Sequence, residues 1–136
     1  MMRQFALNAI GPALVLKHFA PKLARNERSI FAFLSARVGS IGDNRLGGWI
    51  SYRASKAALN QIVRTAAVEV NRTHPRAVVV ALHPGTVATK MTADYATHHR
   101  QLDPSESACA MFKVIDGLAA ENTGGFFAYD GTPIEW

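Results

Sequence analysis

Two short, continuous apolar runs limit the fold of this chain more than any other feature. Residues Ser29–Leu34 contain Ile-Phe-Ala-Phe-Leu, and residues 78–82 read Val-Val-Val-Ala-Leu. A strand with one face in water alternates apolar and polar residues, whereas a strand that is buried on both faces is apolar throughout. Both runs are therefore predicted to be strands of a parallel sheet that has helices on both faces.

The stretches around these runs have helical spacing. Residues 2–24 form the first, and apolar residues at 59, 62, 63, 66, 67 and 70 carry the second through residue 72. Residues 104–118 form the third, with a proline in the first turn and a glycine near the end. Residues 125–129 are predicted to be a last short strand, and the glycines between 39 and 48 mark a loop. The order predicts a single α/β domain with three layers, α/β/α.

Composition excludes several classes of protein. The 136 residues are 49% hydrophobic and 18% charged, which is ordinary for a globular α/β chain. The net charge is +5, but the basic residues are scattered, whereas nucleic-acid binding favours a basic stripe or a known module. No apolar stretch approaches a membrane span and no leader pattern opens the chain, which favours the cytoplasm. The lone Cys109 excludes an intrachain disulfide, and we expect it to be a buried helix residue.

Tyr52 and Lys56 lie four residues apart at the start of the second helical stretch. This spacing places both side chains on one face of a helix. Because a nearby ammonium favours the phenolate, we expect Lys56 to lower the pKa of Tyr52 from its usual value of about 10. A tyrosine tuned in this way can give or take a proton near neutral pH.

The motifs around this pair occur in a fixed order. The first apolar run ends in Ser-Ala-Arg-Val-Gly-Ser-Ile (35–41), and the pair lies in Ser-Tyr-Arg-Ala-Ser-Lys-Ala-Ala-Leu-Asn (51–60). The second run ends in His-Pro-Gly-Thr-Val-Ala-Thr (83–89), Gly-Gly-Phe-Phe-Ala-Tyr-Asp-Gly follows at 124–131, and Asn-Ala-Ile-Gly stands upstream at 8–11. Over nearly its whole length the chain resembles the short-chain dehydrogenase/reductase family. The sequence of residues 37–49 is most similar to the C-factor-like or carbonyl-reductase-like branch of this family.

This resemblance implies a Rossmann-like fold and hydride transfer between a nicotinamide cofactor, NADP or NAD, and a carbonyl or alcohol substrate. The branch favours NADP slightly. Tyr52 would exchange a proton with the substrate oxygen, and Lys56 would lower its pKa and hydrogen-bond the nicotinamide ribose. The turn after the second apolar run would lie against the nicotinamide, with a threonine bonded to its carboxamide. The residues matched to these cofactor contacts are Pro84, Gly85, Val87 and Thr89.

Asn8 is a further candidate catalytic residue. Pro12 stands four positions later and has no N–H for the Asn8 carbonyl, so the helix should kink there. The carbonyl then needs another donor, for which water is the natural choice. In the family that the chain resembles, this asparagine holds a water that relays protons to the lysine.

The donor to the substrate oxygen departs from the family pattern. The family usually has Ser-Ser before x-x-Gly, and its second serine bonds the substrate carbonyl. Counting back from Gly39, that position is Ala36, and the first serine is Ser35. Successive strand residues face opposite sides, so Ser35 cannot replace the missing serine without a bulge. Ser40 is the other hydroxyl within reach. Both serines stay candidates, and we expect Ser40 to matter more.

Residues 90–103 are polar and irregular, and the resemblance implies a lid over the substrate there. The pair His98-His99 suggests a metal, but no cysteine or carboxylate lies beside it at ligand spacing. We therefore expect exposed lid residues and no metal site.

The resemblance also implies that part of the fold is absent. Family members begin with a strand and a Gly-rich turn that brings a helix N-terminus to the pyrophosphate, whereas this chain opens with Met-Met-Arg-Gln-Phe-Ala-Leu. We therefore expect residues 1–136 to be the C-terminal portion of such an enzyme, with a small-molecule substrate and neither nucleic acid nor membrane as partner. The alternative is a non-catalytic binding or signalling chain, because the helices that carry Asn8 and Tyr52 could pair with another subunit.

Overall fold

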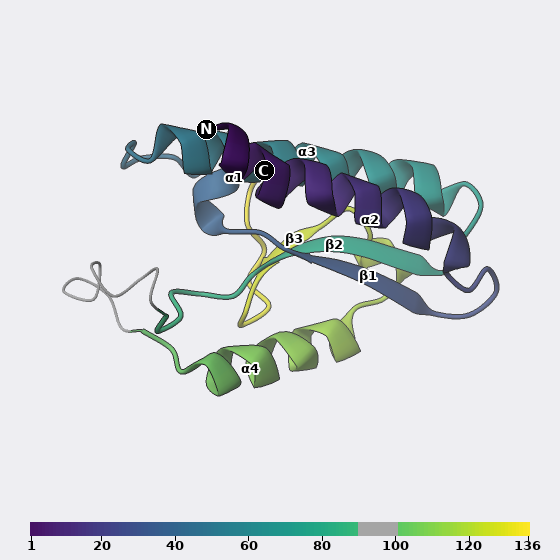
Figure 1. Cartoon of the computed structure of the whole chain (residues 1–136). Helices are drawn as coiled ribbons and strands as arrows, with labels where there is room; N and C mark the ends of the chain where they lie inside the picture. The colour runs from purple at the N-terminus through teal and green to yellow at the C-terminus, as the bar shows by residue number, and fades with distance from the viewer. Residues whose placement is uncertain (90–100) are drawn as a thin grey trace.

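The structure is a computed structural model that describes residues 1–89 and 101–136. Three parallel strands form one sheet in the order β1-β2-β3. Figure 1 shows α1, α2 and α3 on one face of this sheet and α4 on the other. The predicted three-layer α/β fold with a parallel sheet is thus confirmed. The elements in chain order are α1 (Met2–Phe5), η1 (Ala6–Ile10), α2 (Gly11–Phe19), η2 (Ala20–Lys22), β1 (Ser29–Leu34), η3 (Arg37–Gly39), α3 (Ile50–Asn71), β2 (Ala77–His83), α4 (Pro104–Gly117), η5 (Ala120–Asn122) and β3 (Phe126–Ala128).

The central strand β2 is buried on both faces, which accounts for its continuous apolar sequence. Val78, Val79 and Val80 have no exposed surface, because β1 pairs with one edge, residues 123–125 just before β3 bond the other edge, and helices cover both faces. Val79 belongs to the core under α3, together with Leu59 and Val63 of that helix. Val78 and Val80 belong to the core under α4. Alternate residues of one strand therefore serve two separate cores.

The two crossovers of this sheet have opposite hands. The strands follow one another in order and run parallel, yet α3 crosses over one face and α4 over the other. One of the two connections must therefore depart from the usual right-handed rule. Because the three strands are parallel, their carboxyl ends and the loops that follow them lie at one edge of the sheet.

The N-terminal helical region, predicted as a helix over residues 2–24 with a kink at Asn8 and Pro12, has its α-helical pattern interrupted at that place. A π-helical turn, η1, separates α1 from α2, and the Gly11 N–H bonds back to the Ala6 carbonyl. Pro12 stands directly after this turn. A proline lacks the N–H that would close an α-turn on Asn8 and its ring collides with that carbonyl, so a wider turn relieves both problems.

Cys109 is exposed on α4, so the prediction that it would be buried is wrong. Ser107 is the buried small residue on this helix, and its Oγ donates to the Pro84 carbonyl at 2.6 Å. The apolar side chains of α4 that pack against the sheet are Met111, Val114 and Ile115.

Among the described residues, no helix combines the length and the apolar character that crossing a bilayer requires.

Candidate active site

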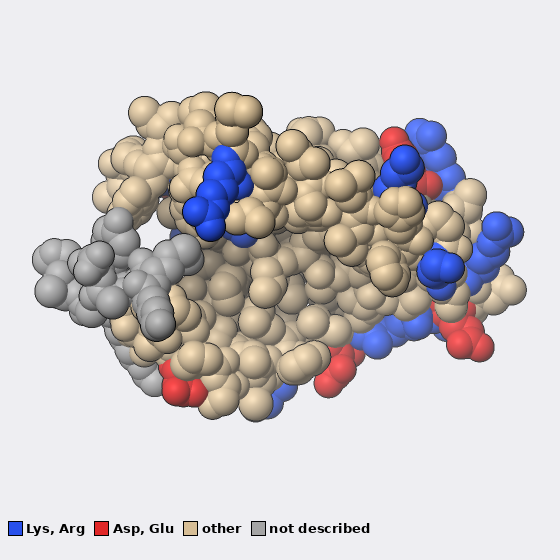
Figure 2. All heavy atoms as spheres, in the orientation of Figure 1, with Lys and Arg blue, Asp and Glu red and all other residues tan. Residues whose placement is uncertain are grey.

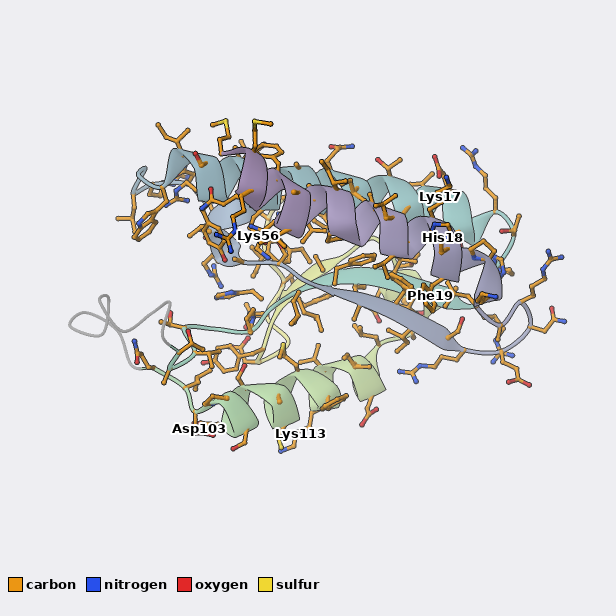
Figure 3. The ribbon with its side chains drawn as sticks, in the orientation of Figure 1. Lys17, His18, Phe19, Lys56, Asp103 and Lys113 are labelled. Atoms are coloured by element: carbon orange, nitrogen blue, oxygen red, sulfur yellow. The ribbon has the colours of Figure 1, made fainter. Side chains whose placement is uncertain are left out.

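The predicted pair at the start of α3 lies beside the carboxyl end of β1. The Lys56 Nζ donates to the Leu34 carbonyl at 2.9 Å and stands 6.0 Å from the centre of the Tyr52 ring. Figure 3 shows Lys56 beneath α3, near that end of the sheet. Lys56 is only 9% exposed, so its ammonium is withdrawn from water and fixed by a strand carbonyl.

The expectation that Lys56 lowers the pKa of Tyr52 is wrong for this structure. Burial raises the pKa of Tyr52, and burial lowers the pKa of Lys56. In both side chains the loss of water disfavours the charged form. The ammonium is 6.0 Å from the ring and bonded elsewhere, so its attraction does not overcome this loss. Tyr52 is therefore a neutral phenol at pH 7, which is the form that can donate a proton.

Gly39 lets the loop after β1 approach this pair. A Cβ on Gly39 would lie 2.8 Å from the Lys56 Cβ and 3.1 Å from the Asn60 Nδ2. Cβ atoms in proteins essentially never come as close as 2.8 Å to another carbon, so any other residue would push the loop away from α3. The Gly39 of the serine-containing motif thus has a steric role against the helix that carries Tyr52.

The two candidate serines are both buried but have different partners. Ser35 is 3% exposed, and its Oγ donates to the Asn60 Oδ1 at 2.6 Å. Ser40 is 2% exposed, and its Oγ accepts from the Asp43 N–H at 3.0 Å. The Ser35 hydroxyl hydrogen is thus committed to α3, whereas Ser40 uses a lone pair and keeps its hydrogen for another acceptor.

Asn8 is connected to the backbone of Tyr52 through the side chain of Ser55. The Asn8 Nδ2 donates to the Ser55 Oγ at 3.0 Å, and the Ser55 Oγ donates to the Tyr52 carbonyl at 2.8 Å. Asn8 lies in the π-helical turn η1, which α3 contacts directly. The structure therefore brings Asn8, Tyr52 and Lys56 together from two helices.

The predicted cofactor residues follow β2 at the same edge of the sheet. Gly85 has φ +81°, and a Cβ there would lie 2.8 Å from the Leu102 Cδ1 and 2.9 Å from the Tyr129 Cδ1. Both the left-handed backbone and the close neighbours require glycine. Val87 then bridges to Leu102, and Thr89 is the last residue before the gap. The predicted lid, including His98 and His99, lies mostly outside the described residues.

His83 is a residue that the sequence analysis missed. It ends β2 directly before the turn at Pro84, and its Nδ1 is buried with no partner among the described residues. Burial lowers the pKa of His83 to about 4; the Arg37 guanidinium adds to this effect and Asp130 opposes it. In the sequence, only its position directly before Pro84-Gly85 could have indicated that His83 lies near the site.

Neither charge on the face in Figure 2 nor metal ligands among the described residues are concentrated at one place. On the face in Figure 2, Lys and Arg side chains stand singly or in small groups between long uncharged areas. Among residues 1–89 and 101–136, no group of three or more His, Cys, Asp or Glu side chains could hold a metal ion.

A family profile described as short chain dehydrogenase matches residues 1–100, nearly three quarters of the chain. The chain belongs to the short-chain dehydrogenase family. It is 40% identical to C-signal of Myxococcus xanthus over its whole length, which covers 78% of that protein. It is also 37% identical to 1-hydroxy-2-glutathionyl-2-methyl-3-butene dehydrogenase of a Rhodococcus species, over 98% of this chain and 58% of the relative.

Solved structures of carbonyl reductases have the same fold as this short-chain dehydrogenase chain. Carbonyl reductase Sniffer of D. melanogaster matches with a TM-score of 0.85 and 31% identity, over 97% of this chain and 55% of that one. The NADPH-bound carbonyl reductase from chicken fatty liver matches with a TM-score of 0.84 and 30% identity, over all of this chain and 58% of the reductase. The chain thus spans a little over half the length of these reductases and of the Rhodococcus enzyme.

Proposed function

We propose that this chain carries the proton-transfer half of an NAD(P)-dependent oxidoreductase that interconverts a carbonyl and an alcohol. The observation that carries the proposal is the Tyr52–Lys56 pair, held at the carboxyl edge of a parallel sheet by the bond from Lys56 to the Leu34 carbonyl. Ligands of open α/β sheets bind outside this edge. As part of this proposal, residues 1–136 correspond to the C-terminal portion of the dehydrogenase domain.

The residues at this edge fit a nicotinamide dinucleotide. The Lys56 ammonium has three hydrogens and uses one on Leu34, so two are left for ribose hydroxyls. Gly85 has φ +81° and Leu102 and Tyr129 fill the space of its missing Cβ, so the turn that would lie against the nicotinamide is held in one shape. NADP is favoured over NAD because the chicken reductase is similar and was solved with NADPH bound. The proposed holding residues are Tyr52, Lys56, Pro84, Gly85, Val87 and Thr89.

The chemistry of the chain's own residues follows from their protonation states. A bound nicotinamide would supply the hydride. Tyr52 is protonated at neutral pH and would donate its phenolic hydrogen to the substrate oxygen as a general acid. Lys56, beside it, would stabilise the phenolate that forms, since the attraction between unlike charges is strong where water is excluded. Asn8 would hold the N-terminal part of α3 in register through Ser55, and either Ser40 or Ser35 would bond the substrate oxygen.

A second function, binding of another protein, is favoured by one specific observation. Several large apolar side chains of the N-terminal helices are exposed, namely Leu7, Ile10, Leu14, Val15 and Phe19. An exposed apolar surface of this kind marks interaction sites in soluble proteins. A homo-oligomer through the helices that carry Asn8 and Tyr52 would cover part of it.

One assay on the purified chain separates these two functions. NADPH and, separately, NADH at millimolar concentration are incubated with aromatic aldehydes, ketones and quinones, and cofactor oxidation is followed at its absorbance band. Oxidation that depends on both the chain and a carbonyl supports the enzyme. No oxidation with any acceptor, by a chain that circular dichroism shows to be folded, would favour the binding function.

A further inference from the structure

The loop that leads into α3 ends in three consecutive left-handed residues. Gly47 has φ +64°, Gly48 has φ +74° and Trp49, the residue before the helix, has φ +45°. The two glycines adopt this conformation freely, but for Trp49 it costs about 1–2 kcal/mol. Such a run persists only where its surroundings hold it in place.

The Arg53 side chain holds this run. Its Nε donates to the Gly47 carbonyl at 3.1 Å and to the Gly48 carbonyl at 3.0 Å, and its NH2 nitrogen donates to the Gly47 carbonyl at 2.9 Å. The guanidinium carbon also lies 5.9 Å from the centre of the Trp49 ring, within reach of a cation–π contact. One planar cation thus fixes two successive carbonyls and the ring that follows them.

The same guanidinium also reaches the other end of the loop. Its NH1 nitrogen donates to the Val38 carbonyl at 3.3 Å, one residue before Gly39. Val38 and Gly47 are nine residues apart, and Ser40 lies between them. A guanidinium can do this because its five N–H donors spread in a rigid plane, which the point charge of a lysine cannot imitate.

We propose that Arg53 is a positioning residue that clamps both ends of the segment 38–49 onto α3 and so sets the wall of the site beside Tyr52. Arg53 follows Tyr52 directly in the helix, and Gly48, Trp49 and Tyr52 line one open hollow of about 350 Å³ with Gln4, Ile50 and Ser51. Without the clamp, the segment would keep its attachment to the chain but lose its fixed distance from the phenol. The catalytic part of this inference rests on the proposed function; the clamp itself does not.

The test compares three variants of the full chain. Arg53→Met keeps most of the aliphatic stem and removes every donor, and Arg53→Lys keeps the charge without the planar fork. Arg64→Met is the matched control, because Arg64 lies on the same helix and donates to the Gly124 carbonyl, two residues before β3 and not in this loop. Thermal unfolding midpoints are measured for all three, so that global loss of stability is separated from local loosening.

The first measurement is the rate at which trypsin cuts after Arg45, an exposed loop residue, followed by mass spectrometry under conditions where the fold is intact. Arg53→Met should raise this rate about tenfold or more through local opening of the loop, and Arg53→Lys should give an intermediate rise. Arg64→Met should leave it unchanged. Equal rates in Arg53→Met and Arg64→Met would overturn the clamp, and a wild-type rate in Arg53→Lys would overturn the role given to the fork.

The second measurement is steady-state kinetics with the carbonyl that the chain reduces best. In Arg53→Met, kcat/KM for the carbonyl should fall on the order of 10-fold to 100-fold, since small misplacements of a site wall have effects of that size. The KM for NADPH should stay unchanged. An unchanged kcat/KM despite faster cleavage after Arg45 would overturn the positioning role. An inactive wild-type chain would count against the proposed function, while the cleavage rates would still decide the clamp.

Discussion

The substrate-oxygen donor is the residue at which this chain departs most clearly from the family pattern, and the two serines beside Ala36 can be separated by experiment. Ser40→Ala should lower kcat/KM by about 10²–10³, the usual loss for one such donor. Ser35→Ala should leave kcat/KM within a few-fold but reduce the free energy of unfolding by about 1 kcal/mol, because it removes the buried bond to Asn60. Kinetics and chemical denaturation of both variants decide, and a larger kinetic loss at Ser35 would refute the assignment. Ala36→Ser should raise the rate.

His83 should make stability depend on pH. Its folded-state pKa of about 4 lies below the value of 6.5 for an unfolded histidine, so between these values the unfolded chain binds a proton that the folded chain does not. The free energy of unfolding should therefore fall as the pH drops from 6.5 to 4, by at most about 3 kcal/mol from this group. Urea denaturation across that range should show a flatter dependence in His83→Gln. The control His18→Gln, on an exposed position of α2, should keep the wild-type slope, and an equally steep slope in His83→Gln would contradict the account.

At the scale of elements, we expect Pro12 to control the position of Asn8, which lies in the π-helical turn η1 directly before this proline. Pro12→Ala restores an N–H to residue 12 and removes the ring, so the turn should relax toward an ordinary α-helix and rotate Asn8 away from Ser55. The thermal midpoint should rise or stay level while kcat falls several-fold. A variant with unchanged kcat would show that the wide turn does not serve the site, and Ala13→Gly is a control for helix propensity alone.

The strands and the order of elements followed from periodicity, because burial on both faces leaves a clear pattern in the sequence. The run 78–82 became β2 with one more residue at each end, and β1 has the predicted bounds Ser29–Leu34. The motif residues Asn8, Tyr52 and Lys56 also met as expected, since helical spacing and the motif order constrain them. The roles given to these residues stay predictions.

The remaining features depend on contacts that no local pattern encodes. The pKa of Tyr52 moves upward because burial, which is set by the whole fold, outweighs a lysine bonded to Leu34. Cys109 turned outward because helical phase placed Ser107 inside instead. The Arg53 clamp joins residues 38 and 47, and its donors find carbonyls that become available only in a left-handed turn.

For the whole molecule, the described chain presents apolar surface along one sheet edge and on the N-terminal helices. β1 pairs only with β2 in the described sheet, and Leu34 is 59% exposed. Open strand edges and exposed apolar side chains favour pairing with another chain. We therefore predict that this chain alone self-associates with concentration and binds NADPH weakly, since the proposed contacts reach only the nicotinamide and its ribose. Size-exclusion profiles and calorimetric titration test this, and a monodisperse monomer with micromolar affinity would contradict it.

The most direct test of the central claim is the turnover of Tyr52→Phe at millimolar NADPH, beside the unsubstituted chain. The substitution removes one hydroxyl and leaves the ring, so the fold and the contacts of Lys56 are kept. Turnover should fall by about 10²–10⁴, the contribution of one positioned acid, while the affinity for NADPH changes less than about twofold. Undiminished turnover in a folded Tyr52→Phe variant would show that the proton comes from another group and that the proposed site is wrong.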